Sequence, residues 1–150
     1  MSHDDGMRIR REVLGDAHVD RATARTTGFT ADFQDFITRY AWGEIWARPL
    51  LDRRTRSCIT LTALVAGGHL QELAMHVRAA LRNGLSPEEV KEVLLQTAVY
   101  CGVPAANAAF AVAQQVLVDD GVIEPPGGDA GSSAAGAGHA EEAGGVADGG

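Results

Sequence analysis

The sequence predicts an all-α fold, and three observations support this prediction. Apolar residues recur three or four positions apart through most of the chain, which is the spacing of an amphipathic helix. Residues that start and stop helices separate these stretches. No stretch alternates apolar and polar residues between turn pairs, so no β-sheet is predicted. We expect six or seven helices in one domain, because 150 residues are enough for one core.

The domain is predicted to span residues 8–124, after a flexible N-terminus over residues 1–7. The stretch MRIRREVLG predicts a short basic helix that Gly15 ends, and DAHVDRATAR predicts a second short helix. The stretch TADFQDFITRYAWGEIW predicts a third, because Thr30 suits the N-cap and apolar residues follow at helical spacing. Pro49 then breaks the chain.

In the second half of the domain, the sequence predicts four more helical stretches. The segment LLDRRTRSCITLTALVAG becomes continuously apolar, which predicts a central buried helix. The next helix runs from about residue 70 to residue 83, and Gly84 ends it. In SPEE, Ser86 suits the N-cap of a further helix and Glu89 completes a capping box. The last helix begins near Pro104.

Composition limits the classes of function. The last 26 residues, 125–150, are mostly Gly, Ala, Ser and Asp, so we expect a disordered tail. The net charge of −7 argues against nucleic-acid binding, although a local arginine cluster can still bind an anionic substrate. No apolar run reaches the roughly 18 residues of a membrane span, and the N-terminus lacks the apolar region of a signal peptide. We expect no membrane association.

The two cysteines indicate a reducing compartment. Cys58 and Cys101 both lie in apolar surroundings and form no CxxC pair, which predicts buried free thiols. We therefore expect a cytoplasmic protein.

An acid and an imidazole stand one helical turn apart in the predicted helix over residues 70–83. Glu72 and His76 lie on the same face because they are four positions apart. A carboxylate at this distance can fix the imidazole tautomer and raise its pKa, which would give a proton donor near neutral pH. The alternative is a surface ion pair, and on spacing alone this is the commoner case.

Other histidines offer less. His69, Glu72 and His76 together have a spacing that can bind zinc or iron, so a metal site is an alternative. His69 also falls at the expected helix start, where it can act as a cap, and we predict no metal. His18 and His139 lack chemical neighbours in the sequence and are predicted to be surface residues.

A cluster of arginines is the second group that suggests chemistry. The stretch WARPLLDRRTRS holds four arginines within nine positions: Arg48, Arg53, Arg54 and Arg56. The planar guanidinium fork binds both oxygens of a carboxylate, so this cluster beside Glu72 and His76 suits a small polycarboxylate. A solvated helix start is the alternative interpretation.

Several long blocks resemble the carboxymuconolactone decarboxylase family over residues 8–120. They are RREVLGDAHVDRA, AWGEIWARPLLDRRTRS, ELAMHVRAALRNGLSPEEVKEVLLQ and YCGVPAANAAF. The resemblance implies an all-helical fold similar to that of alkylhydroperoxidase-D-like proteins. Those proteins carry a CxxC motif whose second cysteine falls at Glu72 and a histidine that falls at His76. No cysteine lies in residues 67–84, and Ser57 falls about where they use a glutamate, so the disulfide chemistry is not expected.

The resemblance implies decarboxylation of 4-carboxymuconolactone to the 3-oxoadipate enol-lactone in protocatechuate catabolism, without a cofactor. It suggests His76 as proton donor and Glu72 as its orienting partner, or the two roles exchanged. Arg48, Arg53 and Arg56 would hold the substrate. Trp42 and Tyr100 would wall the pocket, although Trp42 is equally suited to the core.

Two other functions stay open at this point. One is a redox or stress-related protein of the alkylhydroperoxidase-D-like fold without CxxC, and the other is a purely structural module. The many alanines and the large apolar fraction, 45%, favour burial against other subunits, and the resemblance implies a trimer or hexamer.

Overall fold

The computed structural model describes residues 2–127 and confirms the all-α prediction, since this range contains no β-strand. The helices are α1 (His3–Leu14), α2 (Asp16–Arg25), α3 (Ala31–Ile37), the π-helix η1 (Thr38–Ile45), α4 (Arg53–Gly67), α5 (Leu70–Arg82), α6 (Pro87–Tyr100) and α7 (Val103–Asp119). The predicted tail lies outside the described residues from residue 128 onward.

Helix α1 begins earlier than predicted, so the expectation of a flexible N-terminus over residues 1–7 is wrong from His3 onward. Ser2 is the N-cap: its hydroxyl accepts the Asp5 amide at 3.1 Å, and the Asp5 carboxylate accepts the Ser2 amide at 3.4 Å. This capping box satisfies amides of the first turn and fixes the start. Gly15, with φ of 90°, ends α1 as predicted and leads directly into α2.

The predicted third helix divides into α3 and η1. Within η1 the hydrogen bonds close over five residues, and the Trp46 amide continues this pattern at its end by donating to the Ala41 carbonyl at 2.9 Å. Thr30 does not cap α3 with its side chain, because its hydroxyl accepts the Thr27 amide at 2.9 Å. Helix α1 packs closely on η1, and a Cβ at Gly6 would lie 2.2 Å from the Thr38 carbonyl oxygen.

Helix α4 is less buried than predicted. The Asp52 carboxylate caps it by accepting the Thr55 amide at 2.7 Å. Only one stripe, Ser57, Leu61 and Val65, is buried, and Ile59 on another face is 55% exposed. The prediction of a central buried helix is therefore wrong for the single chain.

The boundaries of α5 and α6 agree with the predictions. Gly84, with φ of 99°, follows the C-cap of α5. Ser86 and Glu89 form the predicted capping box at the start of α6. Cys58 and Cys101 are partly buried free thiols, and burial raises the pKa of the Cys58 thiol.

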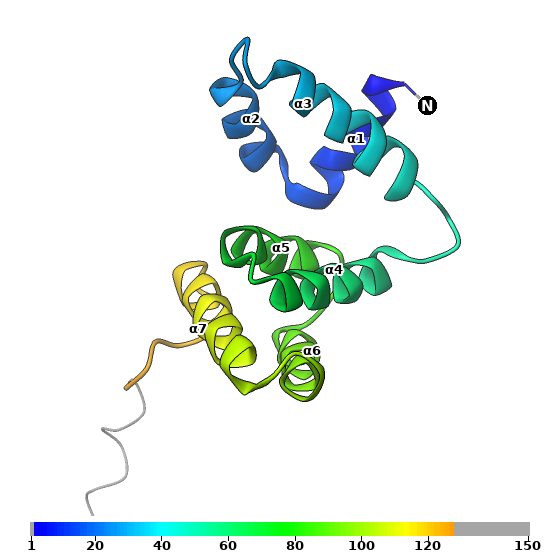
Figure 1. Cartoon of the computed structure of the whole chain (residues 1–150). Coiled ribbons are helices and arrows are strands. Elements are labelled where there is room, and N and C mark those ends of the chain that lie inside the picture. The colour runs from blue at the N-terminus through cyan, green and yellow to red at the C-terminus, as the bar shows by residue number, and fades with distance from the viewer. Residues whose placement is uncertain (1, 128–150) are drawn as a thin grey trace, which may run out of the picture.

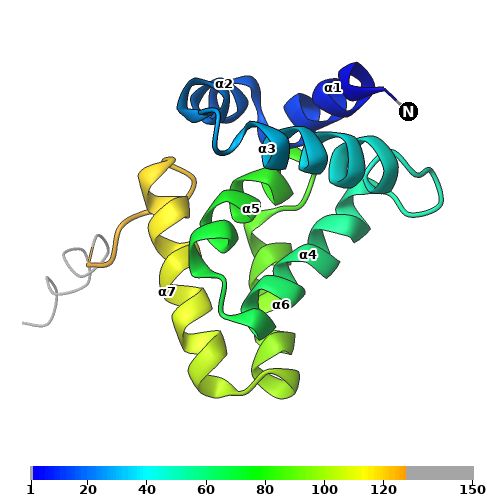
Figure 2. The ribbon, with the colours of Figure 1, turned by 45° about the horizontal axis from the view of Figure 1, so that its top comes forward.

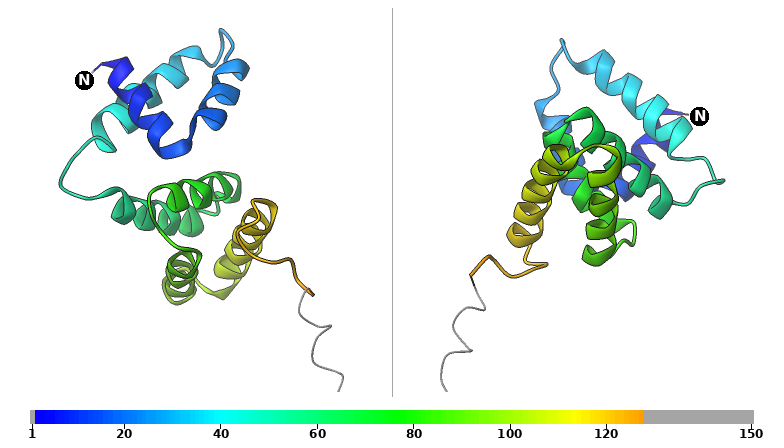
Figure 3. Two further views of the ribbon diagram at one scale, coloured as in Figure 1. Left: turned by 180° about the vertical axis from the view of Figure 1, so that it is seen from behind. Right: turned by 60° about the horizontal axis from the view of Figure 1, so that its bottom comes forward.

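The helices form two layers (Figures 1 and 2), with α1–α3 and η1 lying over the bundle of α4–α7. Figure 3 shows the connection between η1 and α4 running along the outside of the molecule. The bundle has its own core of aliphatic side chains: Leu61, Val65, Leu73, Val77, Ala80, Leu85, Val90, Leu94, Ala109, Ala113, Val116 and Leu117. A smaller core in the upper layer joins Ile9, Val13, Leu14, Val19 and Trp42 to Ala79 of α5. No helix among residues 2–127 is long and apolar enough to cross a membrane.

Candidate active site

Helix α5 carries the two residues singled out from the sequence and lies between the two cores. Leu73 and Val77 anchor it in the bundle core, and Met75 and Ala79 pack in the upper core beside Trp42. A helix held on two sides positions its remaining side chains firmly.

Glu72 and His76 differ in their surroundings. Glu72 is exposed in the first turn of α5, whereas His76 is partly buried one turn later. No ion pair within 4.0 Å joins these two described side chains. Burial is the main cause that lowers the pKa of His76 to about 4, and the nearby His18 lowers it further, while Glu72 acts in the opposite direction. Burial thus outweighs the effect that Glu72 was expected to have on the His76 pKa, and a pKa of about 4 favours the neutral imidazole in the free chain.

The structure places His18 close to His76, which the sequence prediction missed. His18 on α2 is partly buried, and its pKa is lowered by burial and then by Arg10, Arg21, Arg25 and Arg78. It is therefore not the isolated surface residue that we predicted. The spacing of His18 and Arg21, three positions apart on one helix, was the pattern that could have indicated a basic face.

His18 lines a cavity of about 380 Å³ between α2 and the C-terminal half of α5, together with Arg21, Arg78 and Arg82. Arg78 donates to the Asp120 carboxylate at 2.9 Å. The guanidinium of Arg82 lies against Gly15, where an added Cβ would be 3.2 Å from Cζ. Asp16 and Asp120 also line the cavity, so three arginines and a histidine share it with two carboxylates. The excess of basic groups suits an anionic ligand.

The predicted arginine cluster is spread over several contacts. Arg53 forms an ion pair with Glu12 of α1 at 2.6 Å, and Arg54 pairs with Glu89 of α6. Arg56 donates to the Arg48 carbonyl at 3.1 Å, which keeps these two residues together. The buried Nε of Arg56 has no hydrogen-bond partner among the described residues. Arg56 therefore forms no ion pair with a described carboxylate, whereas Arg53 and Arg54 are engaged.

The two predicted aromatic wall residues lie in different places. Trp42 is 6% exposed and packs in the upper core, with its ring 5.4 Å from that of Trp46. Tyr100 is 80% exposed at the end of α6 and lines a separate cavity of about 540 Å³ with Cys58 and Thr97. Within one chain the structure therefore does not gather Trp42 and Tyr100 around one pocket.

The alternative metal site is not assembled in the described part of the chain. Among residues 2–127 no three His, Cys, Asp or Glu side chains are grouped so that they could hold a metal ion. His69, Glu72 and His76 therefore do not form such a group.

The structure thus defines a class of protein. Its fold is all-helical, and its candidate site is built on the partly buried His76 of α5 and on nearby arginines. The family model of the carboxymuconolactone decarboxylase family matches residues 31–115, and the chain belongs to this family.

Three relatives accompany the family match. The chain is 47% identical to 4-carboxymuconolactone decarboxylase of Acinetobacter baylyi over 117 residues, which covers 78% of this chain and 87% of the relative. It is 40% identical to nitrosuccinic acid decarboxylase of Metarhizium robertsii, over 82% of this chain and 88% of the relative. A 4-carboxymuconolactone decarboxylase of Pseudomonas putida is 52% identical over 42 residues, which are 28% of this chain and 88% of that relative.

Proposed function

We propose that this chain is a carboxy-lyase that converts 4-carboxymuconolactone to the 3-oxoadipate enol-lactone in protocatechuate catabolism. The observation that supports this most is the 47% identity, over most of both chains, to a relative that carries the name of this activity. The partly buried imidazole on α5 and an Arg56 that forms no ion pair with a described carboxylate are consistent with a site for an anionic substrate.

The substrate supplies its own electron sink, so the reaction needs no cofactor. The carboxylate that leaves is attached to a carbon vinylogous to the lactone carbonyl. When its C–C bond breaks, CO2 departs and the electron pair moves through the ring alkene onto the carbonyl oxygen. The resulting dienolate takes one proton on the carbon α to the carbonyl. The protein has to orient the dianion, stabilise the dienolate oxygen and deliver that proton.

His76 is the proposed proton donor and Glu72 its partner, and the two roles can also be exchanged. Since the imidazole is neutral in the free chain, it has to take up a proton when the substrate binds. Two substrate carboxylates near the ring would raise its pKa, because a nearby negative charge favours the imidazolium. The substrate would thus create its own acid in the site.

Arg48 and Arg56 are the proposed ligands of the substrate carboxylate, because their side chains have no carboxylate partner among the described residues. Arg53 would first have to leave Glu12. Trp42 would support the site from the core rather than touch the substrate. Tyr100 is still proposed to wall the pocket. A second subunit would have to close the pocket around it.

We propose that the protein is a homo-oligomer, a trimer or a hexamer, in the cytoplasm. Large apolar side chains are exposed on η1 and α3 and around the end of α6; they include Phe33, Phe36, Tyr40, Leu95, Val99 and Val103. Exposed apolar side chains of this size favour association between subunits. Sedimentation equilibrium on the full chain would determine the subunit number.

A second substrate deserves a direct comparison because one relative is a nitrosuccinic acid decarboxylase. In nitrosuccinate the nitro group can accept the electron pair that CO2 leaves behind. The two reactions thus share a requirement for orientation and proton delivery without an added electron sink. The shape and charge of the site would decide between them.

The test is an assay of the purified chain with each substrate. Loss of the ultraviolet absorbance of 4-carboxymuconolactone, with kcat/KM far above that for nitrosuccinate, is the expected result. Turnover of nitrosuccinate alone would reassign the substrate, and no turnover of either would reject the carboxy-lyase proposal. A peroxidase assay in parallel separates both from the redox alternative, for which Cys58 and Cys101 offer no CxxC.

A further inference from the structure

A buried arginine in the upper layer has no carboxylate partner within residues 2–127. Arg10 of α1 is 6% exposed, and its terminal nitrogens donate to the Thr38 hydroxyl at 3.2 Å and to the Gln34 side-chain oxygen at 3.1 Å. Both acceptors are neutral. Its Nε is buried and has no hydrogen-bond partner among the described residues. A buried cation without an opposite charge is costly, so its retention needs an explanation.

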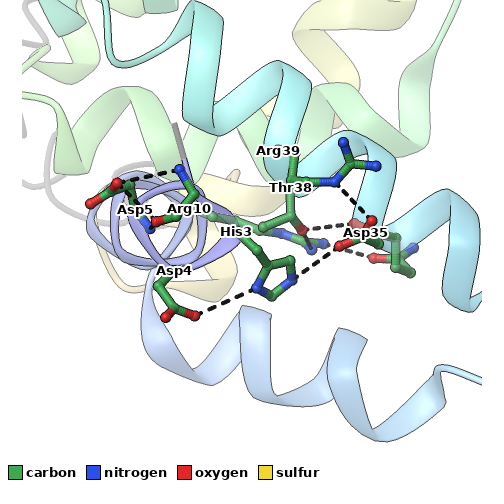
Figure 4. A network of polar contacts seen from close by, with 9 residues as sticks. His3, Asp4, Asp5, Arg10, Asp35, Thr38 and Arg39 are labelled. Carbon is green, nitrogen blue, oxygen red and sulfur yellow. Dashed lines mark hydrogen bonds and ion pairs between the residues drawn. The ribbon is translucent and has the colours of Figure 1, made fainter.

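The carboxylate in this network is already engaged elsewhere. Figure 4 shows Asp35 between Arg39 and His3, and its oxygens lie 2.8 Å from Nε of Arg39 and 3.7 Å from Nε2 of His3. Burial and then the neighbouring Arg11 lower the pKa of Arg10, in keeping with an uncompensated charge. Asp35 therefore does not serve as the counter-ion of Arg10.

Arg10 lines a cavity of about 430 Å³ between α1, α2 and α3. Hydroxyl and amide groups of Thr23, Thr26 and Gln34 line it as well. Thr26 and Gln34 also line a second cavity of about 260 Å³, whose other lining residues include His18 and Arg25. His3 and Asp35 line the first cavity as well, but Asp35 is already paired with Arg39. The other polar groups that line it beside Arg10 are neutral hydroxyls and an amide, and basic residues line the second cavity.

We infer that this cavity is a binding site for a small organic anion, which places a carboxylate against Arg10. The guanidinium has five N–H groups and uses two of them within the network, so donors remain for a carboxylate. The Thr23 hydroxyl supplies a further donor to the ligand, whereas the Thr26 hydroxyl already donates to the Ala22 carbonyl at 3.0 Å. The site is built from α1–α3 and not from α5, and this inference does not rest on the proposed decarboxylation.

The first experiment observes Arg10 directly. The Nε–H resonance of Arg10, assigned by its loss in Arg10→Lys, is followed by NMR while succinate or acetate is added at constant ionic strength. A saturable shift of this resonance, with a parallel rise in Tm, is the expected result. A resonance that stays unmoved in the folded protein overturns the inference.

The second experiment introduces a carboxylate into the protein itself, next to Arg10. Gln34→Glu places a carboxylate next to the Nη atom that now contacts Gln34 and keeps the size of the side chain. It should raise Tm by about 3 °C in the absence of added anion and abolish the response of the Arg10 resonance to succinate. Gln114→Glu on α7, a change of equal charge, should leave that response unchanged.

The following results would contradict the proposed anion site. If Gln34→Glu lowers Tm, or if its Arg10 resonance responds to succinate as in the parent chain, then Arg10 is not the anion ligand. Because succinate can also bind at the proposed active site, a Tm rise that persists fully in Gln34→Glu likewise counts against this site. Decarboxylase activity decides none of these outcomes.

Discussion

The side-chain amide of Asn83 donates a hydrogen bond of 2.9 Å to the hydroxyl of Ser57, which is 2% exposed. This bond joins the end of the helix that carries His76 to the helix that carries Arg53 and Arg56. It therefore sets the distance between the proposed proton donor and the proposed substrate ligands.

Loss of this bond should destabilise the protein. Asn83→Ala leaves the buried Ser57 hydroxyl without its donor, and we expect the free energy of unfolding to fall by about 1–2 kcal/mol. Urea denaturation of Asn83→Ala, Ser57→Ala and the double variant gives the coupling energy. A coupling energy near zero would mean that the two side chains act independently.

The proposed proton donor can be tested by removing its imidazole. His76→Gln should reduce turnover of 4-carboxymuconolactone by at least about 100-fold, because general acid catalysis typically contributes that much. The circular dichroism spectrum and subunit number should stay the same. His69→Gln, at the exposed N-cap of the same helix, is the matched control and should keep full activity. Normal turnover in His76→Gln would remove His76 from the mechanism.

His76 should also make stability depend on pH. Its pKa is about 4 in the folded chain against 6.5 without burial, so the unfolded state binds more protons between these values. The free energy of unfolding should therefore fall as pH decreases from 6.5 towards 4, by at most about 2 kcal/mol between pH 7 and pH 5. Urea titrations at both pH values should show a smaller loss in His76→Gln than in the parent chain. Equal losses in the two proteins would mean that other groups cause the effect.

Glu72 opposes the lowering of the His76 pKa, so removal of its charge should lower that pKa further. Because His76 has to carry a proton to act as the donor, Glu72→Gln should lower the rate and move the alkaline limb of the kcat/KM profile to lower pH. Gln71→Glu, a change next to it in the same exposed turn, serves as the control for surface charge. A pH profile in Glu72→Gln that coincides with the parent profile would leave Glu72 only a structural role.

The turn between α1 and α2 requires glycine. Gly15 has φ of 90° and ψ of 147°, a conformation that side chains rarely adopt, and an added Cβ would press on the Arg82 guanidinium at 3.2 Å. Gly15→Ala should cost about 1–3 kcal/mol in thermal unfolding. At Gly28 an added Cβ meets nothing within 4 Å, so Gly28→Ala should change stability far less.

Local patterns in the sequence were sufficient for most helix boundaries. The SPEE capping box fixed the start of α6, and Gly84 marked the end of α5, because these residues act on backbone groups only a few positions away. The change from α3 to η1 was missed because the apolar spacing of TRYAWGEI suits either kind of helix. Its first residue, Thr38, also lies in close contact with Gly6, more than thirty positions earlier, and no local pattern indicates that contact.

The candidate site was only partly predictable for the same reason. Glu72 and His76 were found because they share one helix, but the burial of His76 depends on two layers that pack around α5. The pairing of Arg53 with Glu12 spans 41 positions, and no local pattern indicates it. His18 approaches His76 from another layer, so its influence became visible only in three dimensions.

The π-helix η1 also has a consequence for how this segment tolerates changes in length. A π-helix spends more residues on each turn than an α-helix does, so one residue deleted near Tyr40 can be absorbed by a return to α-helical winding. In an α-helix without a π-turn, the same deletion would turn the following side chains by about 100° around the helix axis, since an α-helix has 3.6 residues per turn. Here the loss of the π-turn largely offsets that rotation, so Trp42 would keep its place beside Val13 and Ala79 in the upper core. A form of this segment that is one residue shorter can therefore keep the same indole and lose only the π-helical winding.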